Sequence, residues 1–167
     1  KLFKPDRDTL VRDVCLDFDG QRLLFSGLDR TNRWAIFQIA ADGGSLQQLS
    51  PADDPDLDFF DACYLPNGKI VLCSNAYYVG VPCLDGKYKV SSLYRLDPAT
   101  KHLRQLTFDQ DHGNDPAVLH DGRVVYQRWE YSDIPHYFAR RRMTMNPDGT
   151  GQLALYGSNS WFPTAFR

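Results

Sequence analysis

The side chains best suited to chemistry are a few histidine, cysteine and acidic residues on predicted loops. His112, His136 and Cys83 are ligand types for zinc and other transition metals, and Asp111 or Asp115 could add a carboxylate. These residues lie on different predicted connections, so no short ligand spacing supports a metal site. The alternative, which we favour, is that the imidazoles hydrogen-bond to loop backbone. We therefore expect no cofactor in this chain, and a metal at these residues stays a hypothesis.

Calcium binding and acid–base catalysis are two further hypotheses for the same loops. Residues 53–58 and 109–115 are rich in aspartate, but neither segment has the EF-hand pattern of a calcium loop. Four side chains could act as general acid or base: Asp111, Asp115, Glu130 and His136. No Gly-x-Ser-x-Gly elbow or other nucleophile motif accompanies them. The catalytic residues are therefore unknown, and ordinary turn-forming roles are favoured.

Aromatic side chains could instead bind a ligand by stacking. Those on or near the same connections are Tyr77, Tyr78, Trp129, Tyr131, Tyr137, Phe138 and Trp161. Some of them must pack between strands, and any left exposed would suit a sugar, a peptide or a cofactor ring. The basic run 140–142 has acidic neighbours, so we interpret it as a solvated edge with local ion pairs.

The elements that must position these residues are repeated β-hairpins. Asn67-Gly68 lies between two apolar runs and predicts a two-residue type I′ turn. The same design recurs around Gly20 and Gly122, at a spacing of about 50 residues that is typical of repeated units. A second pair of strand-like runs follows each hairpin, and no segment shows a helical period. Each repeat therefore predicts four antiparallel strands.

Four-stranded units at this spacing predict an all-β fold, namely a β-propeller fragment. It would hold about three four-stranded antiparallel blades plus partial neighbouring blades. The blades are expected at residues 11–50, 59–107 and 115–156, with 1–5 and 161–167 belonging to adjacent blades. We expect residues 1–167 to be part of one propeller domain, completed by the remainder of a longer polypeptide or by a second copy.

One rim of such a propeller should carry the long connections. In a four-stranded meander, the second-to-third and fourth-to-first connections emerge on the same side, and here these are the long ones: 50–58, 75–90, 109–115 and 130–138. Function tends to reside on such loops. The ligand-binding residues predicted on this rim are Tyr77, Tyr78, Cys83, Asp111, His112, Trp129, Glu130, Asp133, His136 and Tyr137. His102 and His120 fall near the opposite turns and should be solvated.

Composition excludes several classes of function. The net charge is −2 with both signs interspersed, which argues against a nucleic-acid partner. No apolar run approaches the ~20 residues of a membrane helix, so membrane insertion is not expected. The four cysteines do not resemble a disulfide framework, and Cys15 and Cys63 fit small buried strand positions. No Cys-x-x-Cys-His motif for haem attachment is present.

The repeats resemble the TolB-like (PD40/WD40-like) propeller of bacterial periplasmic proteins. The segments that carry this likeness in the first repeat are 19–26, 36–44 and 48–50. The resemblance implies the fold and an extracytoplasmic location, periplasmic or secreted. It implies little about activity, because one fold hosts many functions.

A narrower likeness is to the propeller of proteins related to the hydrazine synthase alpha subunit. It rests on the segments 63–68, 80–83, 105–112, 126–138, 145–151 and 156–160. In that enzyme the propeller sits among haem-bearing parts, but no haem motif occurs here, so redox activity does not carry over. Relatives often have a cysteine before the proline that matches Pro116, where this chain has Asp115.

These resemblances and the loop-rich rim together suggest two functions. The first is a binding or scaffold module of a larger extracytoplasmic bacterial protein, with a protein or small molecule as ligand. The alternative is the non-catalytic portion of a metal- or haem-dependent redox enzyme.

Overall fold

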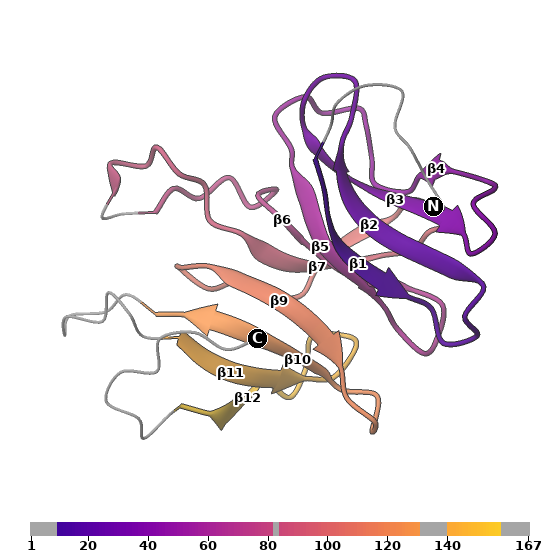
Figure 1. Cartoon of the computed structure of the whole chain (residues 1–167). Coiled ribbons are helices and arrows are strands. Elements are labelled where there is room, and N and C mark those ends of the chain that lie inside the picture. Colours follow the sequence, from indigo (N-terminus) through magenta and orange to yellow (C-terminus); the bar gives the residue numbers. More distant parts are fainter. Residues whose placement is uncertain (1–9, 82–83, 131–139, 158–167) are drawn as a thin grey trace.

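The protein is all-β in the part that the computed structural model describes, residues 10–81, 84–130 and 140–157 (Figure 1). Three four-stranded antiparallel sheets follow one another along the chain, and no α-helix occurs among the described residues. The first sheet comprises β1 (Val11–Leu16), β2 (Arg22–Leu28), β3 (Trp34–Ala40) and β4 (Gln47–Gln48). The second comprises β5 (Phe59–Tyr64), β6 (Ile70–Ser74), β7 (Ser92–Leu96) and β8 (Leu103–Gln105). The third comprises β9 (Gly113–Val118), β10 (Val124–Trp129), β11 (Arg140–Met145) and β12 (Leu153–Tyr156). The predicted fold class is confirmed.

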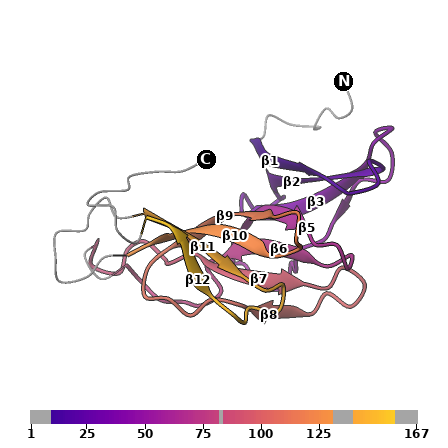
Figure 2. The same cartoon turned by 90° about the horizontal axis from the view of Figure 1, so that it is seen from below.

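The sheets stack through apolar faces, and β5 lies beside both β1 and β9 (Figures 1 and 2). Side chains between the first and second sheets include Leu24, Ile36, Leu49, Ile70, Leu72 and Leu96. Those between the second and third include Val71, Leu93, Leu106, Val124, Tyr126 and Met145. Fully burying one such side chain stabilises a fold by roughly 1.5–3 kcal/mol. Because the second sheet is covered on both faces, it forms the centre of the core.

The hairpin at Asn67-Gly68 uses a different turn from the one predicted. Gly68 has a φ of 78°, but Asn67 is not among the residues with positive φ, so a type I′ turn is excluded. The Leu65 amide donates to the Lys69 carbonyl (2.8 Å), and the Gly68 amide donates to the Leu65 carbonyl (3.0 Å). Pro66 occupies the second position of the turn, where its fixed φ suits a type I turn followed by a glycine bulge.

The first hairpin is one residue longer than the other two. The Asp17 amide donates to the Arg22 carbonyl (2.9 Å), which closes a six-residue loop from 17 to 22. The matching bonds in the other repeats close the five-residue loops 65–69 and 119–123. The carboxylate of Asp17 supports the longer turn, because its Oδ1 accepts the amides of Gln21 (2.8 Å) and Arg22 (3.0 Å).

The extra residue shifts the register of β2. Cys15 pairs with Leu24, four residues after Gly20, whereas Cys63 pairs with Val71, three residues after Gly68. A one-residue shift moves every side chain of a strand to the other face of its sheet. Aligning the repeats by their glycines therefore assigns the side chains of β2 to the wrong faces.

Each inner strand contains a β-bulge with an aspartate in the left-handed conformation. These are Asp13 (φ 54°), Asp61 (φ 55°) and Asp115 (φ 52°), each seven residues before its hairpin glycine. Asp115 was predicted on a long connection, and this placement is wrong: it lies within β9, because that strand begins at Gly113. The three inner strands thus carry the same acidic, locally distorted position.

Two sequence expectations concern the ends of the chain and membranes. The assignment of residues 1–5 and 161–167 to adjacent blades lies outside the described residues. Within the described ranges, no helix has the length and apolar character needed to cross a membrane.

Candidate binding rim

The β6–β7 connection, residues 75–91, is the largest described loop of the rim (Figure 1). It folds back on itself through a bridge between Gly80 and Lys89, and the Val81 amide donates to the Tyr88 carbonyl (2.8 Å). Gly80 is required here, because a Cβ at this position would lie 2.6 Å from the Cα of Gly86. The loop is therefore a small, closely packed hairpin.

This loop contacts segments of both neighbouring sheets. Val81 and Val90, both fully buried, pack against Trp129 at the end of β10 in the third sheet. In the other direction, the Tyr78 hydroxyl donates to Oδ2 of Asp54 (2.5 Å) on the β4–β5 connection. That bond raises the pKa of Tyr78 and lowers the pKa of Asp54. The connections between sheets thus form one contiguous rim.

His112 and Trp129 lie against each other on the rim. Their rings stack with centroids 5.6 Å apart and an interplanar angle of 14°. The guanidinium of Arg140 lies over the Trp129 ring, 4.7 Å from its centroid, an arrangement that favours a cation over an aromatic face. The Trp129 amide donates to the His112 carbonyl (2.8 Å), so backbone and rings hold the two residues together.

The His112 imidazole is neutral and oriented by Ser91. The Ser91 amide donates to Nδ1 of His112 (3.0 Å), and the Ser91 hydroxyl lies 3.1 Å from the same nitrogen. An N–H donor requires an unprotonated Nδ1, so the ring proton is on Nε2. Burial lowers the pKa of His112, and Arg140 acts in the same direction, while Asp111 opposes them. Nδ1 is therefore occupied and unsuited to metal ligation.

Glu130 belongs to a network of four charged residues. Its carboxylate forms ion pairs with Arg128 (3.1 Å) and Arg141 (2.8 Å), and Arg128 also forms an ion pair with Asp109 (3.2 Å). Burial raises the pKa of Asp109, and Arg128 opposes this shift. The run 140–142 thus takes part in local ion pairing and ring contacts, as its acidic surroundings indicated.

The remaining predicted residues divide into placed and undescribed ones. Tyr77 meets Phe108 edge to face, with ring centroids 6.4 Å apart, and Tyr78 is half exposed beneath the Lys89 ammonium. Asp111 is buried and 5% exposed, and His102 and His120 are exposed on the opposite turns as predicted. Cys83, Asp133, His136 and Tyr137 lie outside the described residues. Across residues 10–81, 84–130 and 140–157, no three metal-ligating side chains converge.

Two features of this structure were missed by sequence reasoning. Ser91 had no distinguishing signal, because its role depends on β7 and β9 lying side by side. The bulged aspartates Asp13, Asp61 and Asp115 did have one: an acidic residue stands seven positions before every hairpin glycine.

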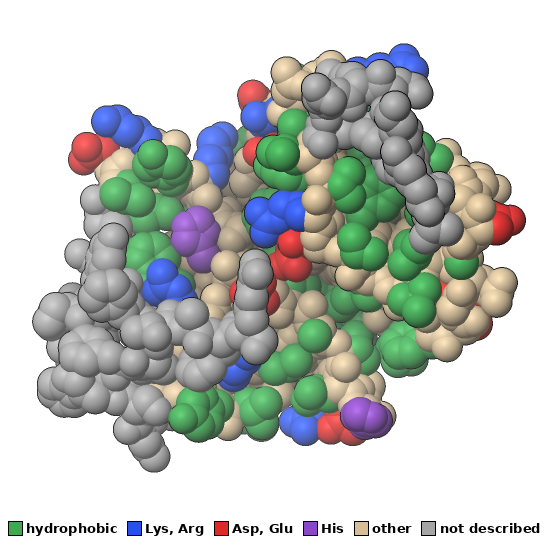
Figure 3. Space-filling view, viewed as in Figure 1, with side chains coloured by type: hydrophobic (Ala, Val, Ile, Leu, Met, Phe, Trp, Pro, Cys, Tyr) green, Lys and Arg blue, Asp and Glu red, His purple; other side chains and the backbone are tan. Residues whose placement is uncertain are grey.

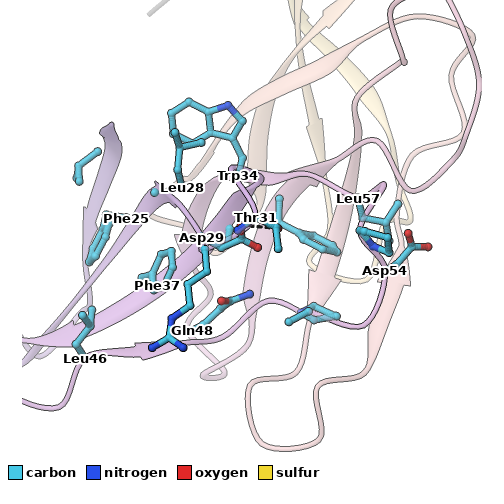
Figure 4. Close-up of a pocket in the computed structure, with 18 residues that line it drawn as sticks. Phe25, Leu28, Asp29, Thr31, Trp34, Phe37, Leu46, Gln48, Asp54 and Leu57 are labelled. Carbon is cyan, nitrogen blue, oxygen red and sulfur yellow. Dashed lines mark hydrogen bonds between the residues drawn. The ribbon is translucent and has the colours of Figure 1, made fainter. Parts of the chain in front are cut away.

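A cavity of about 560 Å³ lies on the face of the first sheet that points away from the second (Figure 4). Phe25 and Phe37 stack in its floor, with centroids 5.5 Å apart and an interplanar angle of 17°. Leu28, Trp34 and Leu57 also line it. Exposed apolar side chains of β1 and the following turn lie nearby, and hydrophobic side chains gather in this region (Figure 3).

Comparisons with known proteins agree with this architecture. No protein-family model matches the sequence, and curated proteins give no match. Among solved structures, hydrazine synthase from Kuenenia stuttgartiensis matches with a TM-score of 0.74 at 15% identity, over 92% of this chain and 26% of that chain. A putative TolB from Agrobacterium tumefaciens gives 0.69 at 16% identity, over 93% and 51% of the two chains. The fold is that of a TolB-like β-propeller.

TolB from Acinetobacter baumannii has the same propeller fold, with a TM-score of 0.61 at 15% identity over 87% of this chain and 32% of that one. This chain thus spans about half or less of each of these three proteins. At such low identity the likeness shows the fold, and the predicted resemblance to TolB-like propellers is confirmed at that level.

Proposed function

We propose that this propeller is a binding or scaffold module of a larger extracytoplasmic bacterial protein, and that it holds a protein or small molecule on the loop-rich rim. The observation that carries this proposal is the β6–β7 connection. It packs on Trp129 of the third sheet and forms a hydrogen bond with Asp54, which lies beside the first sheet. The loops of the three sheets therefore form one continuous surface.

Exposed aromatic rings on that surface support binding by stacking. Tyr78, Tyr88 and Phe108 are 51%, 63% and 67% exposed, and exposed rings of this kind offer apolar area with little side-chain entropy to lose. The extracytoplasmic setting rests on the likeness to TolB alone. The proposed ligand-binding set keeps the residues predicted from sequence, with His112 in a structural role.

Completion of the ring supports the scaffold part of the proposal. In the second and third sheets, the pairs Leu72–Tyr94 and Tyr126–Met143 are covered by the preceding sheet. Phe25–Phe37 is the matching pair of the first sheet, and it lines the cavity of Figure 4 instead. We propose that a further blade covers it, from the remainder of a longer polypeptide or from a second copy.

The second candidate is a non-catalytic part of a metal- or haem-dependent redox enzyme. The match to hydrazine synthase favours it, because it has the highest TM-score of the three structures compared. We propose that this chain itself holds no cofactor, so any metal or haem would be bound by other parts of such an enzyme.

The binding proposal can be tested with peptide and glycan arrays probed by the purified chain. A double substitution, Tyr78→Ala with Phe108→Ala, should abolish the hits, and His120→Ala on the opposite turns should leave them unchanged. Hits that survive the rim substitutions, or an absence of any rim-dependent hit, would overturn the proposal. Elemental analysis of protein purified without added metal tests the cofactor statement: a stoichiometric metal lost in His112→Ala would contradict it.

A further inference from the structure

Asp61 connects all three sheets through its own backbone and side chain. Its amide donates to the Ser26 hydroxyl on β2 (2.8 Å), which ties it to the first sheet. Its carboxylate oxygen Oδ2 accepts the Asp115 amide on β9 (2.6 Å), which ties it to the third. The Cys73 thiol on β6 lies 3.9 Å from the same oxygen. Asp61 thus bonds to the first sheet through its backbone and to the third through its side chain.

The charged groups that face Asp61 are mostly of its own sign. Arg12 and Asp13 face it from β1, and Asp115 faces it from β9. The thiols of Cys73 and Cys63 are the other titratable groups that adjoin it, and burial raises the pKa of each. Arg12 forms an ion pair with Asp13 at 2.7 Å. Within the described part of the chain, its guanidinium is thus the one positive charge among the carboxylates of Asp13, Asp61 and Asp115. The side-chain amide of Gln127 donates a hydrogen bond to the Asp115 carboxylate (3.4 Å) but carries no charge.

Water can reach this position, although Asp61 is largely buried. A cavity of about 470 Å³ lies between the inner strands and is lined by Asp13 and Asp61, among others. The pKa of Asp61 is raised to about 6: burial is the main cause, the charges of Asp115 and Asp13 act in the same direction, and the Asp115 amide and Arg12 oppose them. A proton can therefore exchange at Asp61 with the protein folded.

We propose that Asp61 is a proton-operated latch, which tightens the seam between the second and third sheets when its carboxyl group is protonated and loosens that seam when it is ionised. Either form can accept the Asp115 amide. Only the ionised form is repelled by Asp13 and Asp115, and like charges at close range destabilise a buried site.

The sign of the effect follows from the raised pKa. The folded state binds the Asp61 proton more tightly than the unfolded chain does, so this contribution to stability is fully present below pH 3.8. It is lost as the pH rises from there through about 6. The latch would therefore respond across the weakly acidic range.

The test compares the wild-type chain with Asp61→Asn in urea unfolding at a series of pH values from about 4 to 7.5. Asparagine tolerates the left-handed backbone and carries no charge. The wild-type folding equilibrium constant, divided by that of the variant, should fall as the pH rises, by up to about a hundredfold. The titration of His112 is common to both proteins and cancels in this ratio.

Asp53→Asn is the matched control, because Asp53 is an exposed aspartate on the β4–β5 connection. The wild-type folding equilibrium constant, divided by that of Asp53→Asn, should not change with pH. Hydrogen exchange of the Asp115 amide, corrected for intrinsic rates, should be faster at pH 7.5 than at pH 5 in the wild type. Parallel pH profiles for wild type and Asp61→Asn, or exchange at Asp115 that does not respond to pH, would overturn the proposal; the exchange measurement decides it if Asp61→Asn fails to fold.

Discussion

Among single residues, His112 is the clearest case of a side chain whose orientation is set by one hydrogen bond. Its Nδ1 accepts the Ser91 amide, and its ring stacks on Trp129. Sequence reasoning favoured a structural imidazole, and the hydrogen bond to Ser91 has the form expected of one. The partner was not predictable, because Ser91 and His112 meet only when β7 and β9 are placed side by side.

Replacing His112 with phenylalanine should lower the free energy of unfolding by about 1–3 kcal/mol, because the Ser91 amide would lose its acceptor while the ring stacking survives. Urea unfolding monitored by fluorescence measures this difference. His102→Phe, on an exposed turn, serves as the control and should change stability little. Equal stability of the two variants would show that the Ser91 bond contributes nothing.

The pH dependence of His112 should run opposite to that of Asp61. Its pKa is lowered, so the unfolded chain binds the proton more tightly. Its contribution to stability is complete above pH ~6.5, the ordinary histidine value, and declines as the pH falls below it. In nitrogen-resolved NMR the neutral ring, protonated on Nε2, should be the major form at pH 6.5. A His112 ring that is mostly imidazolium at that pH would contradict the assignment.

At the level of strands and turns, the hairpin pattern in the sequence predicts the number of strands but not their register. Strand-length apolar runs and turn residues predicted three four-stranded repeats, because turn chemistry and period-two alternation are local properties. The register of β2 was not accessible in this way. It depends on whether the turn after Leu16 closes at Gln21 or at Arg22, and Asp17 decides this by accepting both amides.

Deleting Gln21 should destroy the first sheet. A five-residue turn would shift β2 by one position, so that Phe25 and Ser26 exchange faces. We expect loss of near-ultraviolet circular dichroism and rapid hydrogen exchange throughout β2. Gln21→Ala keeps the turn length and should behave like the wild type. A deletion variant with native exchange rates would refute the role assigned to the turn.

Replacing Gly80 with alanine should open the β6–β7 hairpin, because the new Cβ would collide with the backbone of Gly86. Val81 and Val90 would then separate from Trp129, exposing that ring. The expected readout is a red shift of tryptophan emission with little loss of the three sheets. Lys87→Ala, exposed in the same loop, is the control. Unchanged emission in Gly80→Ala would show that the loop packs without the close approach.

The whole molecule presents an apolar face on its first sheet. Leu16 and Phe18, on β1 and the turn after it, are 56% and 68% exposed. The cavity at Phe25 and Phe37 lies on the outer face of this sheet. The matching face of each of the other two sheets is covered by the preceding sheet. Large exposed apolar patches favour association. The repeats in the sequence predicted that further blades complete the propeller, although the residues on this face could be assigned only once the register of β2 was known.

The purified chain should therefore self-associate through this face. Sedimentation velocity should show a weight-average mass that rises with concentration, and Leu16→Lys should reduce that rise. Tyr88→Lys, which changes an equally exposed side chain on the rim, should leave association unchanged. A wild-type chain that stays monomeric at every concentration would contradict the expectation.

The β6–β7 connection also bears on how cooperatively the molecule unfolds. In a stack of repeats, each unit normally contacts only its nearest neighbours, so unfolding can spread from one end like a one-dimensional chain of coupled sites. Here a loop of the second sheet contacts Asp54 before it and Trp129 beyond it. The same loop therefore takes part in both interfaces of the second sheet, so the loss of one interface should loosen the loop at the other. The calorimetric and van't Hoff enthalpies of unfolding should then agree in the wild type and diverge once Gly80→Ala has released the loop.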